Sequence, residues 1–118
     1  MSEVVVVDGA NVVGSVPDGW WRDRRGAAER LRDRLVEYAE RRGAEVVLVV
    51  EGAARGVEPV PGVRVESADG SGDDRIVEIV AELSGQPCTV VTADRELRRR
   101  VEELGARCVG PRAVRGDV

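Results

Sequence analysis

The chain contains no histidine, no lysine and no phenylalanine, and it has only two cysteines. Without histidine it cannot activate a nucleophile through a Ser-His or Cys-His pair, and it cannot bind a metal through imidazole. Without lysine it has no phosphate-loop lysine. The two cysteines, Cys88 and Cys108, are too few for a structural zinc site, and they lie in or beside apolar segments typical of core thiols. Any hydrolytic chemistry must therefore use carboxylates and the hard cations that bind oxygen.

Long apolar segments are also missing. No apolar run approaches the roughly 20 residues that span a bilayer, and the N-terminus enters a short strand instead of a signal sequence. We therefore expect a cytoplasmic protein that has no contact with a membrane. Its 118 residues, 42% of them apolar, are enough for one domain spanning residues 1–118, in which we expect residues 110–118 to form a loose tail. The oligomeric state is open, and a homodimer is compatible with the sequence.

Apolar strand-like runs alternate with amphipathic helical segments along the chain. The runs predict strands at residues 4–7, 46–50, 63–66, 89–92 and 107–109. Helices are predicted at residues 23–42, from residue 73 onwards and at residues 95–104, with loops at 14–21 and 53–62. In the first helix the apolar residues recur at three- and four-residue spacing, which predicts the buried face Ala27, Ala28, Leu31, Leu35, Tyr38 and Ala39. We expect the second helix to bury Ile76, Val77, Val80 and Leu83, and the third to bury Leu97, Val101 and Leu104. This alternation predicts an α/β fold, a three-layer α/β/α sandwich with a mostly parallel five-stranded sheet. We expect the strand order 3-2-1-4-5, which would make the first and fourth strands neighbours.

Acidic residues follow the predicted strands where each strand ends. Asp8 follows the first strand, Glu51 the second and Asp94 the fourth, while Asp73 and Asp74 open the helix that leads into the fourth strand. Ligands of such sheets bind beyond the carboxyl ends of the strands. Crowded carboxylates stay ionised at neutral pH only if a cation neutralises them, and magnesium or manganese prefers such oxygen ligands. We therefore expect four catalytic, metal-binding aspartates: Asp8, Asp73, Asp74 and Asp94.

Each of these acids also has a purely structural explanation. An aspartate after a strand is often a turn former, and an aspartate at the start of a helix caps its free N–H groups. Glu51 fits an ordinary solvated loop acid. These explanations do not predict that the acids meet at one edge of the sheet, so the convergence favours a site.

Three segments of the sequence resemble the NYN branch of the PIN-like nucleases, including the YacP-like proteins: VVVVDGANVVGS, GSGDDRIVEIV and VVTADREL. The resemblance spans about residues 4–110 and implies a PIN-like fold and metal-dependent RNA hydrolysis. It places the four aspartates at the family's metal-binding positions. It also implies that Asn11 holds a phosphate or orients Asp8.

The sequence departs from the family pattern at two positions. Some members carry a further acid one helical turn beyond the position of Asp94, where this chain has Arg98. YacP-like chains often have an aspartate after the second strand, where this chain has Glu51. The resemblance therefore leaves open whether Arg98 weakens turnover and what Glu51 does.

RNA binding requires cationic and stacking side chains. All 18 basic residues are arginines, whose planar guanidinium can bind two phosphate oxygens at once. The arginines expected nearest the cleft are Arg22, Arg24, Arg25 and Arg75. Trp20 and Trp21 lie in a glycine-flanked loop, where we expect one ring to be packed and the other to be available to stack on a base. The alternative is that both rings seal the first long helix onto the sheet.

These observations predict an Mg²⁺- or Mn²⁺-dependent endoribonuclease that hydrolyses phosphodiester bonds of single-stranded or loop RNA. One alternative is a catalytically weak RNA-binding or adaptor module on the same fold. The presence of all four aspartates argues against that module. Arg98 is compatible with it, because an arginine stands where some family members have a further acid. Another alternative is a metal-dependent nucleotide phosphohydrolase, which would need a closed base pocket that the sequence does not indicate.

Overall fold

A continuous run of valines builds the centre of the sheet. In the computed structural model, which describes residues 2–115, β1 (Val4–Asp8) pairs in parallel with β2 (Glu45–Val50) on one side and with β4 (Cys88–Val91) on the other. The edge strands are β3 (Val63–Ser67) and β5 (Arg107–Val109). The five strands form one parallel sheet in the order β3-β2-β1-β4-β5, which confirms the predicted topology.

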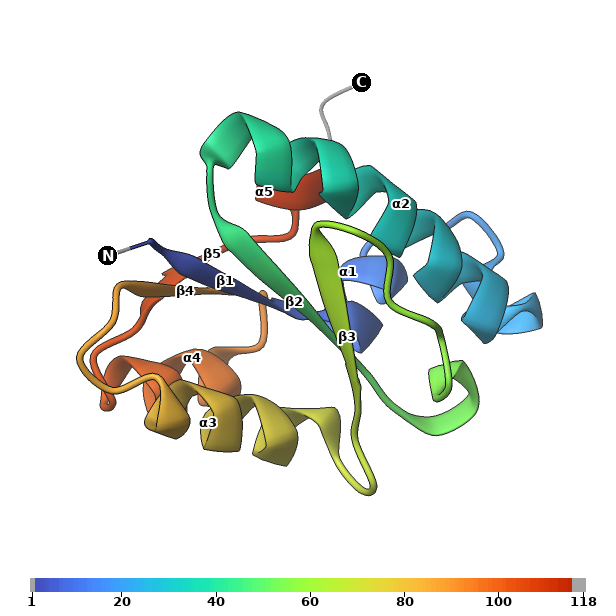
Figure 1. Cartoon of the computed structure of the whole chain (residues 1–118). Helices are drawn as coiled ribbons and strands as arrows, with labels where there is room; N and C mark the ends of the chain where they lie inside the picture. Colours follow the sequence, from blue (N-terminus) through green and yellow to red (C-terminus); the bar gives the residue numbers. More distant parts are fainter. Residues whose placement is uncertain (1, 116–118) are drawn as a thin grey trace.

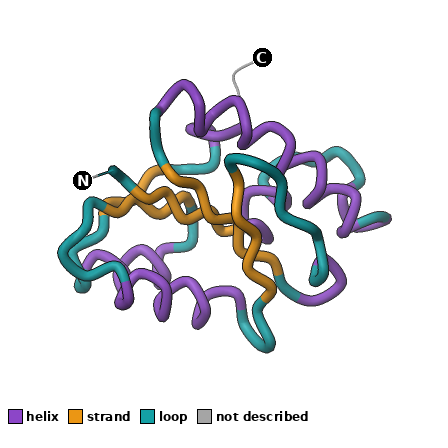
Figure 2. The backbone as a smooth tube through the Cα atoms, in the orientation of Figure 1, coloured by secondary structure: helices purple, strands orange, loops and turns teal. Residues whose placement is uncertain are grey.

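Helices cover both faces of this sheet (Figure 1). One face carries α1 (Gly9–Gly14), α2 (Arg24–Arg42) and α5 (Arg112–Arg115), and the other carries α3 (Gly72–Glu82) and α4 (Arg95–Glu102). Figure 2 shows the same three layers, with the short 3₁₀ turns η1 (Trp20–Arg22) and η2 (Gly52–Ala54) on the α2 side. Each face of the sheet has its own apolar core, and alternate valines of β1 pack into each. Val5 and Val7 pack on the α2 side, and Val4 and Val6 pack on the α3 side. A strand buried on both faces is uniformly apolar for this reason.

Helix α2 begins and ends where its capping residues predict. The Asp23 carboxylate accepts a hydrogen bond from the Gly26 N–H at 2.9 Å, and Gly43 ends the helix with a φ of 63°. Its buried residues are the six whose spacing predicted the apolar face: Ala27, Ala28, Leu31, Leu35, Tyr38 and Ala39.

Helix α1 was not predicted. Residues 9–14 form it because the Asp8 side chain caps its N-terminus and Val12 is buried against the sheet. A helix of only six residues is too short to display the apolar periodicity from which helices are predicted.

Two predicted apolar faces differ in detail from the structure. Helix α3 buries Ile79 in place of Val77 and Leu83, which are only partly buried. Leu104 was predicted to face inward but is 44% exposed, because α4 ends at Glu102. Both errors concern the ends or the flank of a helix, where periodicity alone is least informative.

The predicted loose tail is wrong over residues 110–115. Pro111 is buried, and Val114, 3% exposed, packs into the core beneath α2. The Arg34 guanidinium donates to the Arg115 carbonyl at 3.3 Å, and the Arg115 guanidinium donates to the Ser15 carbonyl at 3.2 Å. Residues 116–118 lie outside the described residues. Among residues 2–115, no helix has the length and apolar character needed to cross a membrane.

Candidate active site

Asp8 is a buried acid at the carboxyl end of the central strand. Only 4% of it is exposed, and Oδ2 accepts a hydrogen bond from the Thr92 hydroxyl at 2.9 Å. Oδ1 accepts a weaker hydrogen bond from the Asn11 N–H at 3.3 Å. Both carboxylate oxygens of Asp8 are therefore oriented by neighbouring segments.

Thr92 is a site residue that sequence reasoning missed. It is fully buried directly after β4, and its hydroxyl also accepts a hydrogen bond from the Asp94 N–H at 3.1 Å. The hydroxyl thus joins the ends of β1 and β4. The sequence feature that could have identified Thr92 is its position two residues before Asp94, at the end of a predicted strand.

Asn11 fastens the loop between β4 and α4 to helix α1. Its side-chain oxygen accepts a hydrogen bond from the Ala93 N–H at 2.8 Å, while its backbone N–H orients Asp8. Arg98 also contacts this segment: its Nε donates a hydrogen bond to the Thr92 carbonyl at 2.8 Å. The arginine in place of the family acid therefore supports the end of β4.

The glycine after Asp8 permits helix α1 to start close to β2. A Cβ at Gly9 would lie 2.6 Å from the carbonyl oxygen of Val49, which is backbone and cannot rotate away. Only glycine fits at this position without moving the strand or the helix. The Asp-Gly element of the sequence thus has a steric origin.

An open pocket of about 250 Å³ lies at the carboxyl edge of the sheet. Its lining residues are Asp8, Ala10, Asn11, Glu51, Asp73 and Asp94. Three of the four predicted aspartates therefore line one pocket, together with Glu51. The Glu51 carboxylate lies against Gly72 at the start of α3, since a Cβ at Gly72 would be 2.6 Å from Glu51 Oε1.

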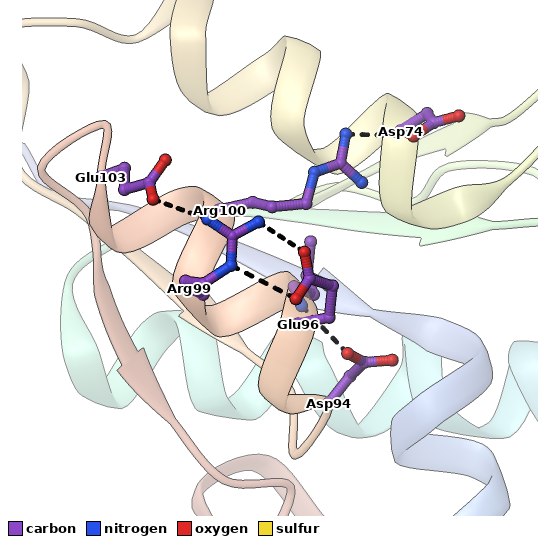
Figure 3. Close-up of polar contacts among 7 residues, drawn as sticks. Asp74, Asp94, Glu96, Arg99, Arg100 and Glu103 are labelled. Atoms are coloured by element: carbon purple, nitrogen blue, oxygen red, sulfur yellow. Dashed lines mark hydrogen bonds and ion pairs between the residues drawn. The ribbon is translucent and has the colours of Figure 1, made fainter.

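Asp74 does not join this pocket, and in this respect the predicted cluster is wrong. Asp74 is exposed, and its carboxylate accepts a hydrogen bond from the Arg100 guanidinium at 3.1 Å (Figure 3). Successive residues of a helix point about 100° apart, because one turn takes 3.6 residues. In this structure Asp73 faces the pocket, while Asp74 points away from it towards Arg100.

Asp94 has a structural role as well as a place in the pocket. Its Oδ1 accepts a hydrogen bond from the Leu97 N–H at 2.9 Å, so Asp94 caps the N-terminus of α4 (Figure 3). The structural explanation of this residue is correct, and it is compatible with a site role because a carboxylate offers a second oxygen.

Burial and like charge perturb the acids of the pocket. Burial raises the pKa of Asp8 from its ordinary 3.8 to about 6; the hydrogen bonds from Thr92 and Asn11 oppose this rise, and the nearby charges of Asp73 and Glu51 add to it. The pKa of Asp73 is also raised, first by burial and then by the charges of Asp94 and Glu51. The pocket therefore concentrates negative charge that its lining does not neutralise.

The donor chemistry of the pocket fits a hard divalent cation. Carboxylate oxygens are the ligands that Mg²⁺ and Mn²⁺ prefer. The pKa values of Asp8 and Asp73 are raised first by burial and then by neighbouring acids, and a bound cation would favour the ionised form of both groups. Within residues 2–115, however, no three acidic side chains lie close enough to hold one ion. The pocket acids would have to rotate towards one another to share it.

The two tryptophans and their neighbouring arginines lie in and beside η1. Trp21 is 52% exposed, while Trp20 is partly buried, so one ring is packed and the other is open, as expected. The Arg22 guanidinium lies 5.8 Å from the Trp21 ring centroid, and that of Arg24 lies 5.3 Å from the Trp20 centroid. Arg25 instead donates to the Gly56 carbonyl at 2.8 Å.

Arg75 forms ion pairs with three neighbouring glutamates. Its guanidinium contacts Glu66 at 2.6 Å, Glu78 at 3.1 Å and Glu82 at 3.8 Å, and these contacts raise its pKa. A phosphate would therefore have to compete with three carboxylates for the Arg75 guanidinium.

Comparison with known proteins assigns the chain to a family. The model of the YacP-like NYN domain matches residues 5–118, whereas no curated protein matches the chain. A crystal structure of Rae1 (YacP) from Bacillus subtilis shares the fold with a TM-score of 0.80 at 22% identity, over 93% of this chain and 70% of that one. A single-residue mutant of Rae1 gives a TM-score of 0.77 at 23% identity, over 97% of this chain and 72% of that one. The chain belongs to the YacP-like NYN domain family, whose members are nuclease-like domains that act on RNA.

Proposed function

We propose that this protein is a metal-dependent endoribonuclease that hydrolyses phosphodiester bonds of single-stranded or loop RNA in the cytoplasm. The observation that carries the proposal is the acidic pocket at the carboxyl edge of the sheet. Asp8, Glu51, Asp73 and Asp94 meet there, and no basic side chain of the described residues is part of its lining.

The proposed ligands of the cation are Asp8, Asp73 and Asp94, with Glu51 as a further candidate. Asp8 is the fixed ligand, because Thr92 and Asn11 orient both of its oxygens. Asp94 keeps one oxygen for capping α4 and offers the other to the pocket. A bound Mg²⁺ or Mn²⁺ would supply an activated water and would offset negative charge on the scissile phosphate.

The residues proposed to hold the RNA strand lie in η1 and at the start of α2. Arg22 and Trp21 are both exposed and lie face to face, which presents a cation and a ring to solvent together. Arg24, which is also exposed, lies over the partly buried Trp20 ring in the same way. Guanidinium groups bind phosphate oxygens, and indoles stack on bases.

A catalytically weak RNA-binding module is the second candidate function. The observation in its favour is that, within residues 2–115, no three carboxylates converge on one point. Such a module would bind RNA through the same arginines and tryptophans and would leave the strand intact.

One experiment separates the two candidates. Pure protein is incubated with end-labelled single-stranded RNA in Mg²⁺, in Mn²⁺, and in EDTA. The endoribonuclease produces internal cleavage with either metal and none in EDTA. RNA that is retained by the protein but stays intact in all three conditions would assign the protein to the binding module.

A further inference from the structure

A second pocket lies beside the acidic one, between α1, η1, α2, β2 and η2. Its volume is about 240 Å³. Most of its wall is made of small or aliphatic residues: Gly9, Ala10, Val13, Ala28, Val50 and Ala54. The remaining wall includes Trp20, Arg24 and Glu51. The pocket therefore combines an apolar floor with two planar side chains and one carboxylate.

The two pockets are contiguous. Ala10 and Glu51 line both of them, so a group in the apolar pocket lies next to the acidic pocket. A ligand that filled both would carry a flat apolar part next to a part that a divalent cation held by the carboxylates would attract. A nucleotide unit of RNA has this composition, because its base is a flat heterocycle and its phosphate binds divalent cations.

The planar groups of the apolar pocket suit a base. The Arg24 guanidinium lies 5.3 Å from the centroid of the Trp20 ring, and Trp20 packs on Gly14 of α1, where an added Cβ would be 3.7 Å from the indole. Indole rings and guanidinium planes both stack on nucleobases with little preference for sequence. An aliphatic side chain of a partner protein would use the apolar floor but would gain nothing from Arg24.

We propose that this pocket, lined by Trp20, Arg24 and Ala54, binds one nucleobase of the RNA strand whose phosphate lies at the acidic pocket. The proposal rests on the proposed function, which it deepens by adding a base subsite next to the scissile phosphate. A base held there fixes the position of the neighbouring phosphodiester, and such orientation is a large part of what a hydrolase must supply.

The test uses two alanines of the same short turn. Ala54 lines the pocket and is partly buried, whereas Ala53 is exposed and does not line it. Adenosine and uridine, which carry no phosphate, are titrated into the protein in EDTA, and binding is followed by NMR at the Val13 amide and the Trp20 indole N–H. Saturable shifts are expected at both groups. Ala54→Leu should weaken nucleoside affinity about tenfold, the loss of roughly one base contact, while Ala53→Leu should bind like the wild type.

A second pair of variants guards against a folding defect in Ala54→Leu. Trp20→Leu should also lose about tenfold in nucleoside affinity at the Val13 amide, because Trp20 lines the pocket. Arg41→Leu should not, because Arg41 is exposed near the C-terminal end of α2 and lines neither pocket. Equal affinities within both pairs would overturn the base subsite. Saturable binding of N-acetyl-leucine amide with no binding of nucleosides would overturn it too and would assign the pocket to a protein side chain.

The subsite and the proposed function fail separately. Nucleoside binding that Ala54→Leu weakens, in a protein that never cleaves RNA, supports the subsite and overturns the endoribonuclease. Metal-dependent RNA cleavage with no saturable nucleoside binding supports the endoribonuclease and overturns the subsite.

Discussion

The hydroxyl of Thr92 donates a 2.9 Å hydrogen bond to Oδ2 of Asp8, a residue 84 positions away in the chain. Thr92 has no exposed surface and Asp8 is almost completely buried. This hydrogen bond joins two neighbouring strands at their carboxyl ends and orients the acid that we place at the centre of the proposed metal site. It also opposes the rise in the pKa of Asp8 that burial causes.

Replacing Thr92 with valine removes the hydroxyl and keeps the shape of the side chain. A buried oxygen of Asp8 then loses its donor, so we expect Thr92→Val to lower the free energy of unfolding by about 1–3 kcal/mol and to reduce RNA cleavage strongly. Thr89→Val is the matched control, because Thr89 is a buried threonine of β4 whose hydroxyl donates to Glu3 instead. Urea unfolding and RNA cleavage are measured for both. Equal losses of cleavage in the two variants would contradict a specific role of Thr92.

The neighbouring acids Asp73 and Asp74 provide a second matched pair. Asp73 lines the acidic pocket, whereas Asp74 pairs with Arg100 outside it. We therefore expect Asp73→Asn to abolish metal-dependent cleavage and Asp74→Asn to retain most of it. Loss of the exposed ion pair should cost at most about 1 kcal/mol of stability. The measurement is the RNA cleavage rate of both variants at saturating Mn²⁺. An inactive Asp74→Asn variant would show that Asp74 belongs to the active site.

The raised pKa of Asp8 predicts how stability depends on pH in the absence of metal. Because the folded-state pKa of about 6 lies above the ordinary value of 3.8, the folded protein binds this proton more tightly than the unfolded chain does. This contribution to stability is fully present below about pH 4 and is lost as the pH rises through about 6.

Asp8→Asn removes the charge at nearly constant volume and keeps a residue that caps helices well. In EDTA at pH 8 the variant should be more stable than the wild type, by on the order of 1–3 kcal/mol. The difference should shrink towards zero as the pH falls to 4. Urea unfolding of both proteins across this range measures it. A variant that is less stable than the wild type at pH 8 would make Asp8 a structural turn residue.

Divalent metal should stabilise the wild type, because a ligand that binds only the folded state shifts the unfolding equilibrium by mass action. At a metal concentration 100 times the Kd the gain is about 2.7 kcal/mol. Melting curves of wild type, Asp8→Asn and Asp74→Asn are compared with Mg²⁺, with Mn²⁺ and with EDTA. The wild type and Asp74→Asn should melt higher with metal, and Asp8→Asn should not. A shift of the same size in all three proteins would indicate binding elsewhere.

Two glycines of α1 should respond in opposite ways to alanine. Gly9→Ala places a Cβ 2.6 Å from the Val49 carbonyl oxygen, so the variant should lose at least about 2 kcal/mol of stability. Gly14→Ala meets only ordinary contact with Trp20 at 3.7 Å, and alanine favours the helix by up to about 1 kcal/mol. Thermal or urea unfolding of the two variants tests the steric origin of the Asp-Gly element. Equal stability of the two variants would show that α1 can move away from β2.

The sequence by itself determined the five strands, the extent and buried face of α2, and the position of Asp8, Glu51 and Asp94 at one edge of the sheet. Each of these follows from local information. A run of valines forms a strand buried on both faces, spacing by three and four defines a helical face, and the carboxyl ends of parallel strands lie at one edge.

Only the tertiary structure decided which acids share a pocket and which partners hold them. Asp73 and Asp74 are equivalent in sequence, but the direction of each side chain depends on how α3 is rotated against the sheet and on Arg100, which comes from α4. Thr92 is a site residue because its hydroxyl binds Asp8, which lies near the other end of the chain. The guanidinium of Arg75 is paired with Glu66, Glu78 and Glu82, and the sequence did not indicate these contacts. The base pocket likewise needs five elements to meet: α1, η1, α2, β2 and η2. Such relationships join segments that are distant in sequence, and local pattern carries no information about them.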